Sequence, residues 1–365
     1  MDPFSQAALG AVVGQAAGHA RLGYRAATVG ALAGAMPDLD VLLAIGGDAF
    51  DQLVVHRGIT HSLFFAPVAG PILGLLMWRW ERRRAAANPP DTARRAAWIL
   101  VVTLALLSHP LLDYLTPYGT QLLLPFSNAR FAIDAMPIID PVYTLLLAVG
   151  LVIAARWQRA RAPQVALATL LVSCAYLAWG GWLNVAAERE AERQLAAIGL
   201  QDARVAAFPT VLQIHYRRVV ARTPERDLVG FVSMWRPCAI DWQGAPRLGR
   251  DHPLVRRFLT TREGRIFDWF TMGWSRYRVE HADGHRWLHA SDLRYGFTPD
   301  PDRSIFNVRV RVLPHGELAG VMEPGRDTTE ATGQRLRQLV LHAYAPDCSS
   351  GTTARIGGSA VGAGQ

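Results

Sequence analysis

The chain has 365 residues, half of them hydrophobic, and a formal net charge of +8 at pH 7. All 38 basic side chains are arginine, because the sequence contains no lysine. Long apolar runs fill much of the first half, which excludes a single ordinary soluble domain. Many arginines lie in short segments between these runs. That pattern indicates membrane topology and argues against direct nucleic-acid binding.

Two segments rich in alanine and glycine, 7–17 and 26–36, begin the chain and predict a helical hairpin. Small residues of this kind allow helices to pack closely in a membrane. Stronger apolar runs follow, and their lengths predict spanning helices. These runs are Ser62–Trp78, Ala96–Leu112, the shorter Val142–Ala155, and Val165–Leu183.

Arginines are concentrated between the first and second of these runs and between the third and fourth. Their positions indicate the orientation of the bundle in the membrane. The loop arginines are Arg79, Arg82, Arg83, Arg84, Arg94 and Arg95, followed by Arg156, Arg159 and Arg161. Cytoplasmic loops carry such an excess of positive charge, so these loops are expected inside. The stretches 37–61 and 116–141 each carry one arginine and are expected outside. The chain is therefore predicted to be a multi-pass protein of a bacterial inner membrane.

The pattern changes after the last apolar run. Residues 186–198 form a charged helical segment, and short alternating runs separated by turns then predict strands. The predicted strands include Val211–Tyr216, Leu228–Trp235, Arg276–Glu280 and Ile305–Val312, with a turn at Asp283-Gly284. We therefore predict a mainly α membrane helical bundle over 1–185 and a β-rich α+β extracytoplasmic domain over 186–348. A disordered tail is expected over 349–365.

Three cysteines bear on the compartment of the second domain. Cys174 lies inside an apolar run, where a cysteine acts as a small hydrophobe. Cys238 and Cys348 both fall in the second half, and they can pair if this half lies outside the cytoplasm.

Acids and histidines stand at the ends of the apolar runs. Ionisable side chains at membrane depth are unfavourable and usually mark function. The set consists of Asp38, Asp40, His56, His61, His109 and Asp113. With the arginine loops inside, all of them fall at the outer face of the membrane.

The spacing of these residues suggests how they converge. His109 and Asp113 are four apart and share one helix face, although Pro110 is expected to interrupt that helix. Asp38 and Asp40 share a face if their segment is extended. Gly58 suggests a turn that directs both His56 and His61 inward.

Mixed imidazole and carboxylate ligands suit a divalent metal, zinc first, with manganese or iron as alternatives. Six such ligands can hold two ions, an arrangement used to hydrolyse phosphoesters. The guanidinium of Arg57 matches a phosphate or carboxylate group. We therefore assign metal binding to all six residues and catalytic roles to Arg57, His61 and Asp113.

Other polar residues have weaker claims to the site. Asp2 and Gln6 fall on the same side of the membrane, but an acid at the start of a chain is commonly a helix cap. Asp134 and Asp140 are expected either beside the site or in turns. The histidines 281, 285 and 289 have helical spacing, but Asp283-Gly284 predicts a hairpin in which they do not converge.

These residues carry a resemblance to a known family. The strings 33–40 (AGAMPDLD), 56–62 (HRGITHS) and 109–120 (HPLLDYLTPYGT) resemble the YdjM-type family, together with Met1-Asp2, Gln6, 8–10 (ALG) and 124–127 (LPFS). This family is described as inner-membrane-associated metal-dependent hydrolases and as LexA-binding. The resemblance covers about 1–185. It implies a metal site and hydrolase activity, and a LexA-type partner.

The sequence leaves several functions open. Preferred is metal-dependent hydrolysis of a phosphoester or lipid-like substrate at the outer face of the inner membrane. The alternative is a non-catalytic scaffold or regulator in which the metal is structural. A transporter fits less well, because the polar residues gather at one face rather than at the midplane.

Overall fold

In the computed structural model of the chain, every residue is described except 86–89, 157–158, 283, 327–332, 347, 349–352, 357–358 and 363–365. The chain divides into two compact units. The first contains Met1–Trp179 with Val211–Gln213, and the second contains Gly180–Thr210 with Ile214–Gln365. The predicted fold class is confirmed, because the first unit is helical and the second is rich in strands.

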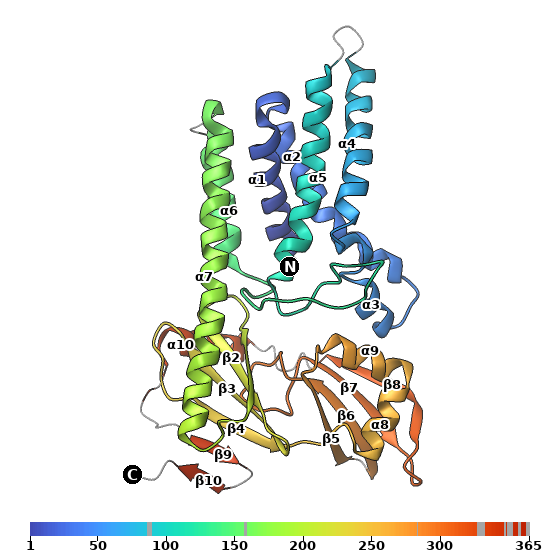
Figure 1. Cartoon of the computed structure of the whole chain (residues 1–365), viewed down its shortest axis with the longest axis vertical. Coiled ribbons are helices and arrows are strands. Elements are labelled where there is room, and N and C mark those ends of the chain that lie inside the picture. Colours follow the sequence, from blue (N-terminus) through green and yellow to red (C-terminus); the bar gives the residue numbers. More distant parts are fainter. Residues whose placement is uncertain are drawn as a thin grey trace. The chain divides into compact units, whose positions relative to one another are not determined.

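The first unit is a helical bundle (Figure 1). Its long helices are α1 (Pro3–Leu22), α2 (Arg25–Ala35), α4 (Phe65–Arg84), α5 (Thr92–Tyr114), α6 (Pro141–Arg156) and the first part of α7 (Ala162–Ala197). Short elements link them: η1 (Met36–Ala44), α3 (Ala49–Val55), η2 (Ile59–His61) and η3 (Arg159–Arg161). Local signals set the starts of two long helices, because the side chains of Asp2 and Asp91 accept hydrogen bonds from the first turns of α1 and α5.

The predicted hairpin is formed by α1 and α2, which approach each other closely at glycines. A Cβ atom at Gly10 would lie 2.3 Å from the carbonyl oxygen of Gly30, and one at Gly30 would lie 2.2 Å from that of Gly10. A Cβ at Gly34 would meet the Gly10 backbone in the same way. Only glycine permits this backbone contact, so the small residues of this region set the distance between the two helices.

Among the described residues, three helical stretches are long and apolar enough to cross a membrane: Arg25–Ala44, Thr92–Tyr114 and Ala162–Ala197. A fourth span arises if Ala49–His61 and Phe65–Arg84 count as one stretch with a bend of 64°. Pro141–Arg156 is apolar but shorter, as expected. The predicted spans lie within helices, except that the run Ser62–Trp78 starts three residues before α4, which begins at Phe65. Pro110, however, does not interrupt α5, which continues to Tyr114.

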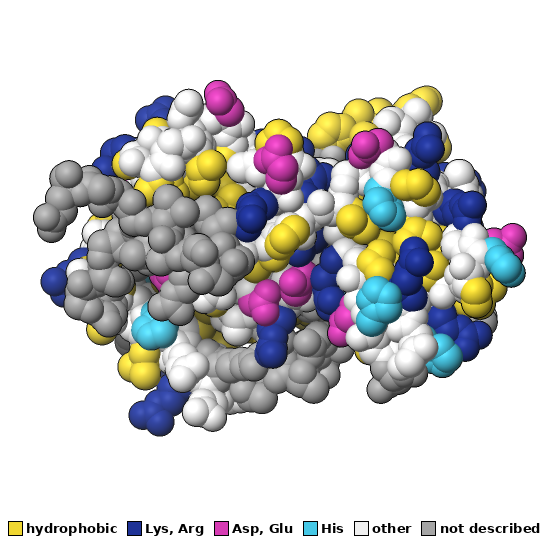
Figure 2. All heavy atoms as spheres, turned by 90° about the horizontal axis from the view of Figure 1, so that it is seen from below, with side chains coloured by type: hydrophobic (Ala, Val, Ile, Leu, Met, Phe, Trp, Pro, Cys, Tyr) yellow, Lys and Arg dark blue, Asp and Glu magenta, His cyan; other side chains and the backbone are white. Residues whose placement is uncertain are grey.

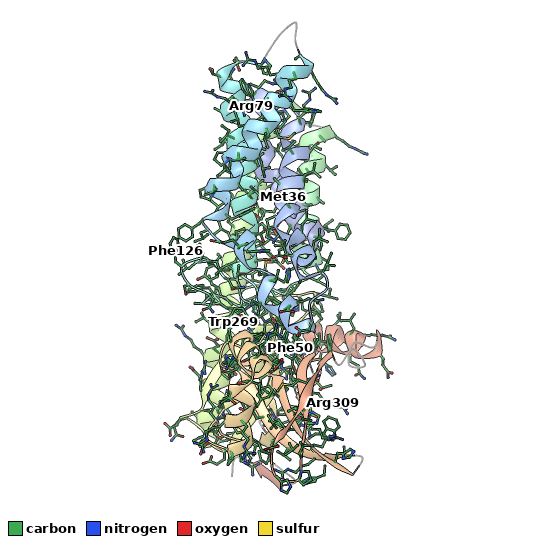
Figure 3. The ribbon with its side chains drawn as sticks, turned by 90° about the vertical axis from the view of Figure 1, so that its right-hand side faces the viewer. Met36, Phe50, Arg79, Phe126, Trp269 and Arg309 are labelled. Atoms are coloured by element: carbon green, nitrogen blue, oxygen red, sulfur yellow. A yellow bond between two sulfur atoms is a disulfide. The ribbon has the colours of Figure 1, made fainter. Side chains whose placement is uncertain are left out.

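The connections that carry arginine lie at one end of the bundle. The turn between α1 and α2, the end of α4 with the start of α5, and the end of α6 all lie at the upper end in Figure 1. Arg79 is labelled near this end in Figure 3. Helix α5 runs through the centre, where Val101, Ala105 and Leu106 are fully buried. The arginine-bearing connections therefore lie at one end of α5, and His109 and Asp113 lie at the other end.

The second unit contains two sheets. In the first, β1 (Arg204–Pro209), β2 (Tyr216–Arg222), β3 (Arg226–Ser233) and β4 (Asp241–Pro246) are antiparallel neighbours. The second has the order β5-β6-β7-β8 and is also antiparallel, with β5 (Ser275–Ala282), β6 (His285–Asp292), β7 (Phe306–Val312) and β8 (Leu318–Arg326). The helices of this unit are α8 (Pro253–Thr260), α9 (Arg262–Phe270) and α10 (Gly333–Tyr344).

The charged segment 186–198 is helical as predicted, and it continues α7, which extends to Ala197. No glycine or proline interrupts the chain between Leu183 and this segment. Ala187, Ala191 and Leu195 follow at helical spacing and are fully buried in the core of the second unit. The last apolar run and the charged segment therefore form one helix with two different environments.

One predicted strand is wrong. Residues 211–215 of the run Val211–Tyr216 form turns and bends, and β2 begins only at Tyr216. The backbone φ of Leu212 is 73°, a left-handed conformation that an extended strand does not contain. By contrast, the runs at 228–235, 276–280 and 305–312 lie largely in β3, β5 and β7.

The end of the chain differs in part from the expectation. Strands β9 (Thr353–Ile356) and β10 (Ser359–Gly362) fall within the segment predicted to be disordered, and β9 pairs in parallel with β4. Cys238 and Cys348 form a disulfide, whereas Cys174 is a free and exposed thiol. On the face of the second unit in Figure 2, histidines lie apart from one another among arginines and hydrophobic side chains.

The glycine contact predicts that Gly30→Ala destabilises the protein. Alanine favours a helix interior over glycine by roughly 0.5–1 kcal/mol, but overpacking a tight contact costs roughly 1–3 kcal/mol, so the clash is expected to dominate. Thermal melting of the full chain in detergent measures the effect. Leu32→Ala is the control, because Leu32 lies on the same helix and is 68% exposed. An unchanged melting temperature for Gly30→Ala would contradict the close helix contact.

Candidate metal centre

Four side chains from three elements converge inside the first unit. Asp38 comes from η1, His61 from η2, and His109 and Asp113 from successive turns of α5. One ligand atom from each lies within 4.8 Å of the others, a grouping that could hold a metal ion. His61, His109 and Asp113 are fully buried, whereas the side chain of Asp38 is 18% exposed.

Local structure explains why these residues meet. His109 and Asp113 project from one face of α5, as their spacing predicts. His61 reaches the site through a sharp turn in which Arg57 has a φ of 60° and η2 follows directly. Asp38 and Asp40 lie in a 3-10 helix rather than an extended segment. Their carboxylates therefore do not share a face, and they approach different nitrogens of His61.

The hydrogen bonds of the two imidazoles determine which nitrogens carry hydrogen. Nδ1 of His109 lies 2.5 Å from the carbonyl oxygen of Gly34, which can only accept a hydrogen bond. Nδ1 of His61 lies 3.2 Å from Oδ2 of Asp40 and 3.0 Å from the hydroxyl oxygen of Thr60, which itself donates to Asp40. Each Nδ1 therefore carries the hydrogen, and in the neutral rings each Nε2 presents a lone pair. The two Nε2 atoms face each other at 2.9 Å.

Two carboxylate oxygens complete this arrangement. Oδ1 of Asp38 lies 3.4 Å from Nε2 of His61 and 3.3 Å from Nε2 of His109. Oδ2 of Asp113 lies 3.2 Å and 3.6 Å from the same two nitrogens. Oδ1 of Asp38 accepts no hydrogen bond within the described residues, whereas Oδ2 of Asp113 also lies 3.0 Å from Nε of Arg57. Four possible ligand atoms thus face one buried space, and this grouping could hold a cation.

The size of the group fits a metal. Ligand atoms about 2.1 Å from a zinc ion, at the corners of a tetrahedron, lie about 3.4 Å apart. The separations between 2.9 and 3.6 Å agree with that value. Two imidazole nitrogens and two carboxylate oxygens are also a donor set that suits zinc, manganese or iron.

Asp40 and His56 lie beside the group of four rather than in it. Oδ1 of Asp40 is 2.9 Å from Nδ1 of His56. Its Oδ2 accepts hydrogen bonds from the backbone N–H of Arg57 at 2.9 Å and from the hydroxyl of Thr60 at 3.1 Å. Asp40 therefore holds the turn together and orients His61. Such outer partners fix the ring orientation of metal-binding histidines.

Arg57 is 1% exposed, and its guanidinium is directed at Asp113. Nε lies 3.0 Å from Oδ2 of Asp113, and Nη1 donates to the hydroxyl of Thr116 at 2.8 Å. The guanidinium also lies over the ring of Tyr118, 4.7 Å from its centroid. These contacts favour a role in balancing the charge of Asp113. Sequence reasoning does not find Thr116 and Tyr118, although they lie within five residues of Asp113.

The remaining polar residues have supporting roles. Gln6 donates from Nε2 to Oδ1 of Asp113 at 3.0 Å, and the amino group of Met1 lies 2.6 Å from the same oxygen. Asp2 caps α1, as its position suggests, and Asp140 accepts a hydrogen bond from the backbone N–H of Tyr143 at the start of α6. Asp134 has a φ of 58° and lies in a loop.

The three histidines of the second unit lie in the hairpin of β5 and β6. His281 pairs with Arg286, and His285 pairs with Ala282, so the helical spacing does not apply. Asp283 lies outside the described residues, but Gly284 has a φ of 71° in the turn. Nε2 of His289 instead lies 3.2 Å from Oε2 of Glu280.

The helical bundle and its buried histidine and aspartate cluster define a multi-pass membrane protein with a site that could hold a metal. Residues 1–187 match the model of the YdjM inner membrane protein family, and the chain belongs to this family. The resemblance found in the sequence is thereby confirmed.

A segment of 98 residues is 38% identical to the inner membrane protein YbcI of Escherichia coli (strain K12). This segment covers 26% of the chain and 51% of that protein, so the chain spans about half the length of the relative it matches. No solved structure matches the chain.

Substitutions of His109 and of Asp40 should weaken metal binding to different extents. His109→Ala removes a ligand and is expected to abolish stoichiometric metal binding. Asp40→Asn leaves all four ligands but weakens the partner of His61, so the metal affinity should fall about 10- to 100-fold while full loading remains attainable. Metal titration with elemental analysis measures both effects.

The exposed Asp202→Asn is the control for loss of an acid. Wild-type affinity in the Asp40→Asn variant would contradict the positioning role of Asp40.

Proposed function

We propose that the centre binds a divalent metal, zinc first and manganese or iron as alternatives, and that it hydrolyses a phosphoester or ester bond in a lipid-like substrate. The convergence of four lone-pair donors at Asp38, His61, His109 and Asp113 carries this proposal. We infer one ion from this grouping, since Asp40 and His56 make other contacts.

A divalent metal at such a site supplies a Lewis acid that activates a water molecule and polarises a phosphoryl or carbonyl oxygen. The residues of the chain have separate tasks around it. His61 and Asp113 would hold the ion, and the carboxylate of Asp113 would offset part of its positive charge. Asp40 and Gly34 hold the two imidazoles in place through Nδ1. Arg57 offsets the negative charge of Asp113.

The surroundings of Asp38 support a lipid-like substrate. Asp38 is the most exposed of the four ligands, and it lies in η1, whose apolar side chains are largely exposed. Leu39 is 57% exposed, and Leu43 is 69% exposed. Phe126, which projects outward in Figure 3, is 79% exposed and packs edge-on against Phe64. Exposed apolar side chains on the element that supplies Asp38 suit a substrate that stays in the bilayer.

A second function is favoured by one observation. Structural zinc sites use four protein ligands, whereas catalytic sites commonly use three and keep a position for water. Four protein ligands are grouped here, three of them fully buried. The alternative is therefore a structural metal that holds η1, η2 and α5 together in a membrane scaffold or regulatory protein.

Activity measurements separate the two functions. The metal-loaded full chain in detergent or vesicles should hydrolyse a chromogenic phosphodiester or a fluorescent phospholipid. His61→Ala and Asp113→Ala should reduce kcat/KM at least about a hundredfold, the scale expected for loss of a group essential to the chemical step. His315→Ala, an exposed histidine of the second unit, is the control.

Metal content must be measured on the same preparations. Wild-type protein that carries stoichiometric metal but hydrolyses no ester class would support the structural function instead. Wild-type protein without metal would overturn both.

We also propose that the arginine-bearing connections lie in the cytoplasm and that the metal centre and the second unit lie on the periplasmic side. The positive-inside rule supports the first placement, because these connections lie at one end of the bundle. The disulfide between Cys238 and Cys348 supports the second, because disulfides persist in oxidising compartments such as the periplasm.

Reporter fusions check this topology. Alkaline phosphatase fused behind the full chain should be active, because it folds only in the periplasm. The same reporter inserted after Ala85, between α4 and α5, should be inactive. The reverse pattern would reverse the orientation.

A further inference from the structure

A second polar cluster lies in the first unit, at the end of the bundle opposite the metal centre. A cavity of about 460 Å³ opens there between α2, α4 and α5. Its lining includes Arg25, Val29, Met77, Trp80, Arg84 and Trp98. Thr28 and the buried Glu81 also line it, most of the other lining side chains are apolar or aromatic, and the two arginines are exposed. The cavity thus combines an apolar wall with a cationic rim.

Arg84 and Trp80 form one side of this rim. The guanidinium of Arg84 lies over the indole ring of Trp80, 4.3 Å from its centroid. Trp80 is itself 50% exposed. This contact places the cation beside an amphipathic ring, a combination typical of the interface between membrane and water.

The carboxylate at the base of the cavity is already neutralised. Glu81 is buried, and its oxygens accept hydrogen bonds from Arg25 at 2.8 Å and from Arg94 at 2.7 and 2.9 Å. The indole N–H of Trp98 donates to the same carboxylate at 2.8 Å. Arg25, Arg84 and Arg94 together carry three positive charges against the one negative charge of Glu81, which leaves a net charge of +2.

We propose that this cavity binds a phospholipid with an anionic headgroup. The phosphate engages Arg25 and Arg84 at the rim, and an acyl chain lies against Val29, Met77 and the ring of Trp80. Arginine suits this task because its guanidinium matches phosphate geometry and binds well next to an aromatic ring. Basic pockets between membrane helices are known to bind anionic headgroups. The apolar wall distinguishes this ligand from free phosphate.

This site is independent of the proposed hydrolysis. None of its residues contributes to the group of four ligands, and its location is at the other end of α5. Its ligand would join α2, α4 and α5 at the arginine-bearing end, where Arg94 also donates to the backbone carbonyl of Arg21.

Native mass spectrometry of the full chain in detergent tests the proposal. The protein is titrated with phosphatidylglycerol and, separately, with phosphatidylcholine of the same acyl chains. Wild type should retain phosphatidylglycerol preferentially. Arg84→Gln should weaken this binding about fivefold, the effect of roughly one arginine contact at a membrane surface. Trp80→Ala should weaken the binding of both lipids.

Arg79→Gln is the matched control, because it removes the same charge from the same helix at an exposed position that does not line the cavity. Its binding should stay within twofold of wild type, and all variants should melt at the wild-type temperature without lipid. Equal losses in Arg79→Gln and Arg84→Gln would overturn the site in favour of diffuse surface attraction. Equal retention of the two lipids, or full competition by inorganic phosphate, would overturn an anionic phospholipid as the ligand.

Discussion

The first unit depends on a concentration of buried charge that an apolar bundle cannot hold without compensation. Two carboxylate oxygens and two imidazole nitrogens lie close together, at 3.2 Å between His61 and Asp113. The Nδ1 atoms of the imidazoles face Asp40 and Gly34, and Oδ2 of Asp113 also faces Arg57. A buried charge is tolerated only when it is paired or binds a metal. This requirement explains why η1, η2 and α5 meet at this point, although they are separated from one another along the sequence.

Helix α5 connects this centre to the opposite end of the bundle. Arg94 and Trp98 in its first turns bind Glu81, and His109 and Asp113 in its last turns belong to the group of four. Between them the helix is fully buried at Val101, Ala105 and Leu106. The two polar clusters are therefore held at a fixed separation by one rigid, apolar segment. The glycine contact of α1 and α2 has a similar effect, because it positions the Gly34 carbonyl that orients His109.

Much of the fold followed from local patterns. Apolar runs predicted the helices because length and hydropathy are sufficient to recognise a membrane span, and alternation predicted most strands of the second unit. The run Val211–Tyr216 failed because the left-handed conformation of Leu212 has no signature in a hydrophobic pattern. The segment 186–198 is helical as predicted, but it belongs to the same helix as the apolar run before it. A change from apolar to charged residues marks a change of surroundings, and α7 passes through it without a break.

The sequence by itself determined which residue types stand at the ends of the apolar runs, and the periodicity of α5 determined that His109 and Asp113 share a face. Only the tertiary structure decided which acids belong to the group of four and which acid instead contacts a histidine of that group from outside. Asp38 and Asp40 are equivalent in a sequence pattern, yet Asp38 faces both Nε2 atoms and Asp40 faces Nδ1 of His61. That difference arises from the 3-10 geometry of η1 and the turn at Arg57. Sequence periodicity specifies a face of one element, whereas a ligand set depends on the distances between several elements.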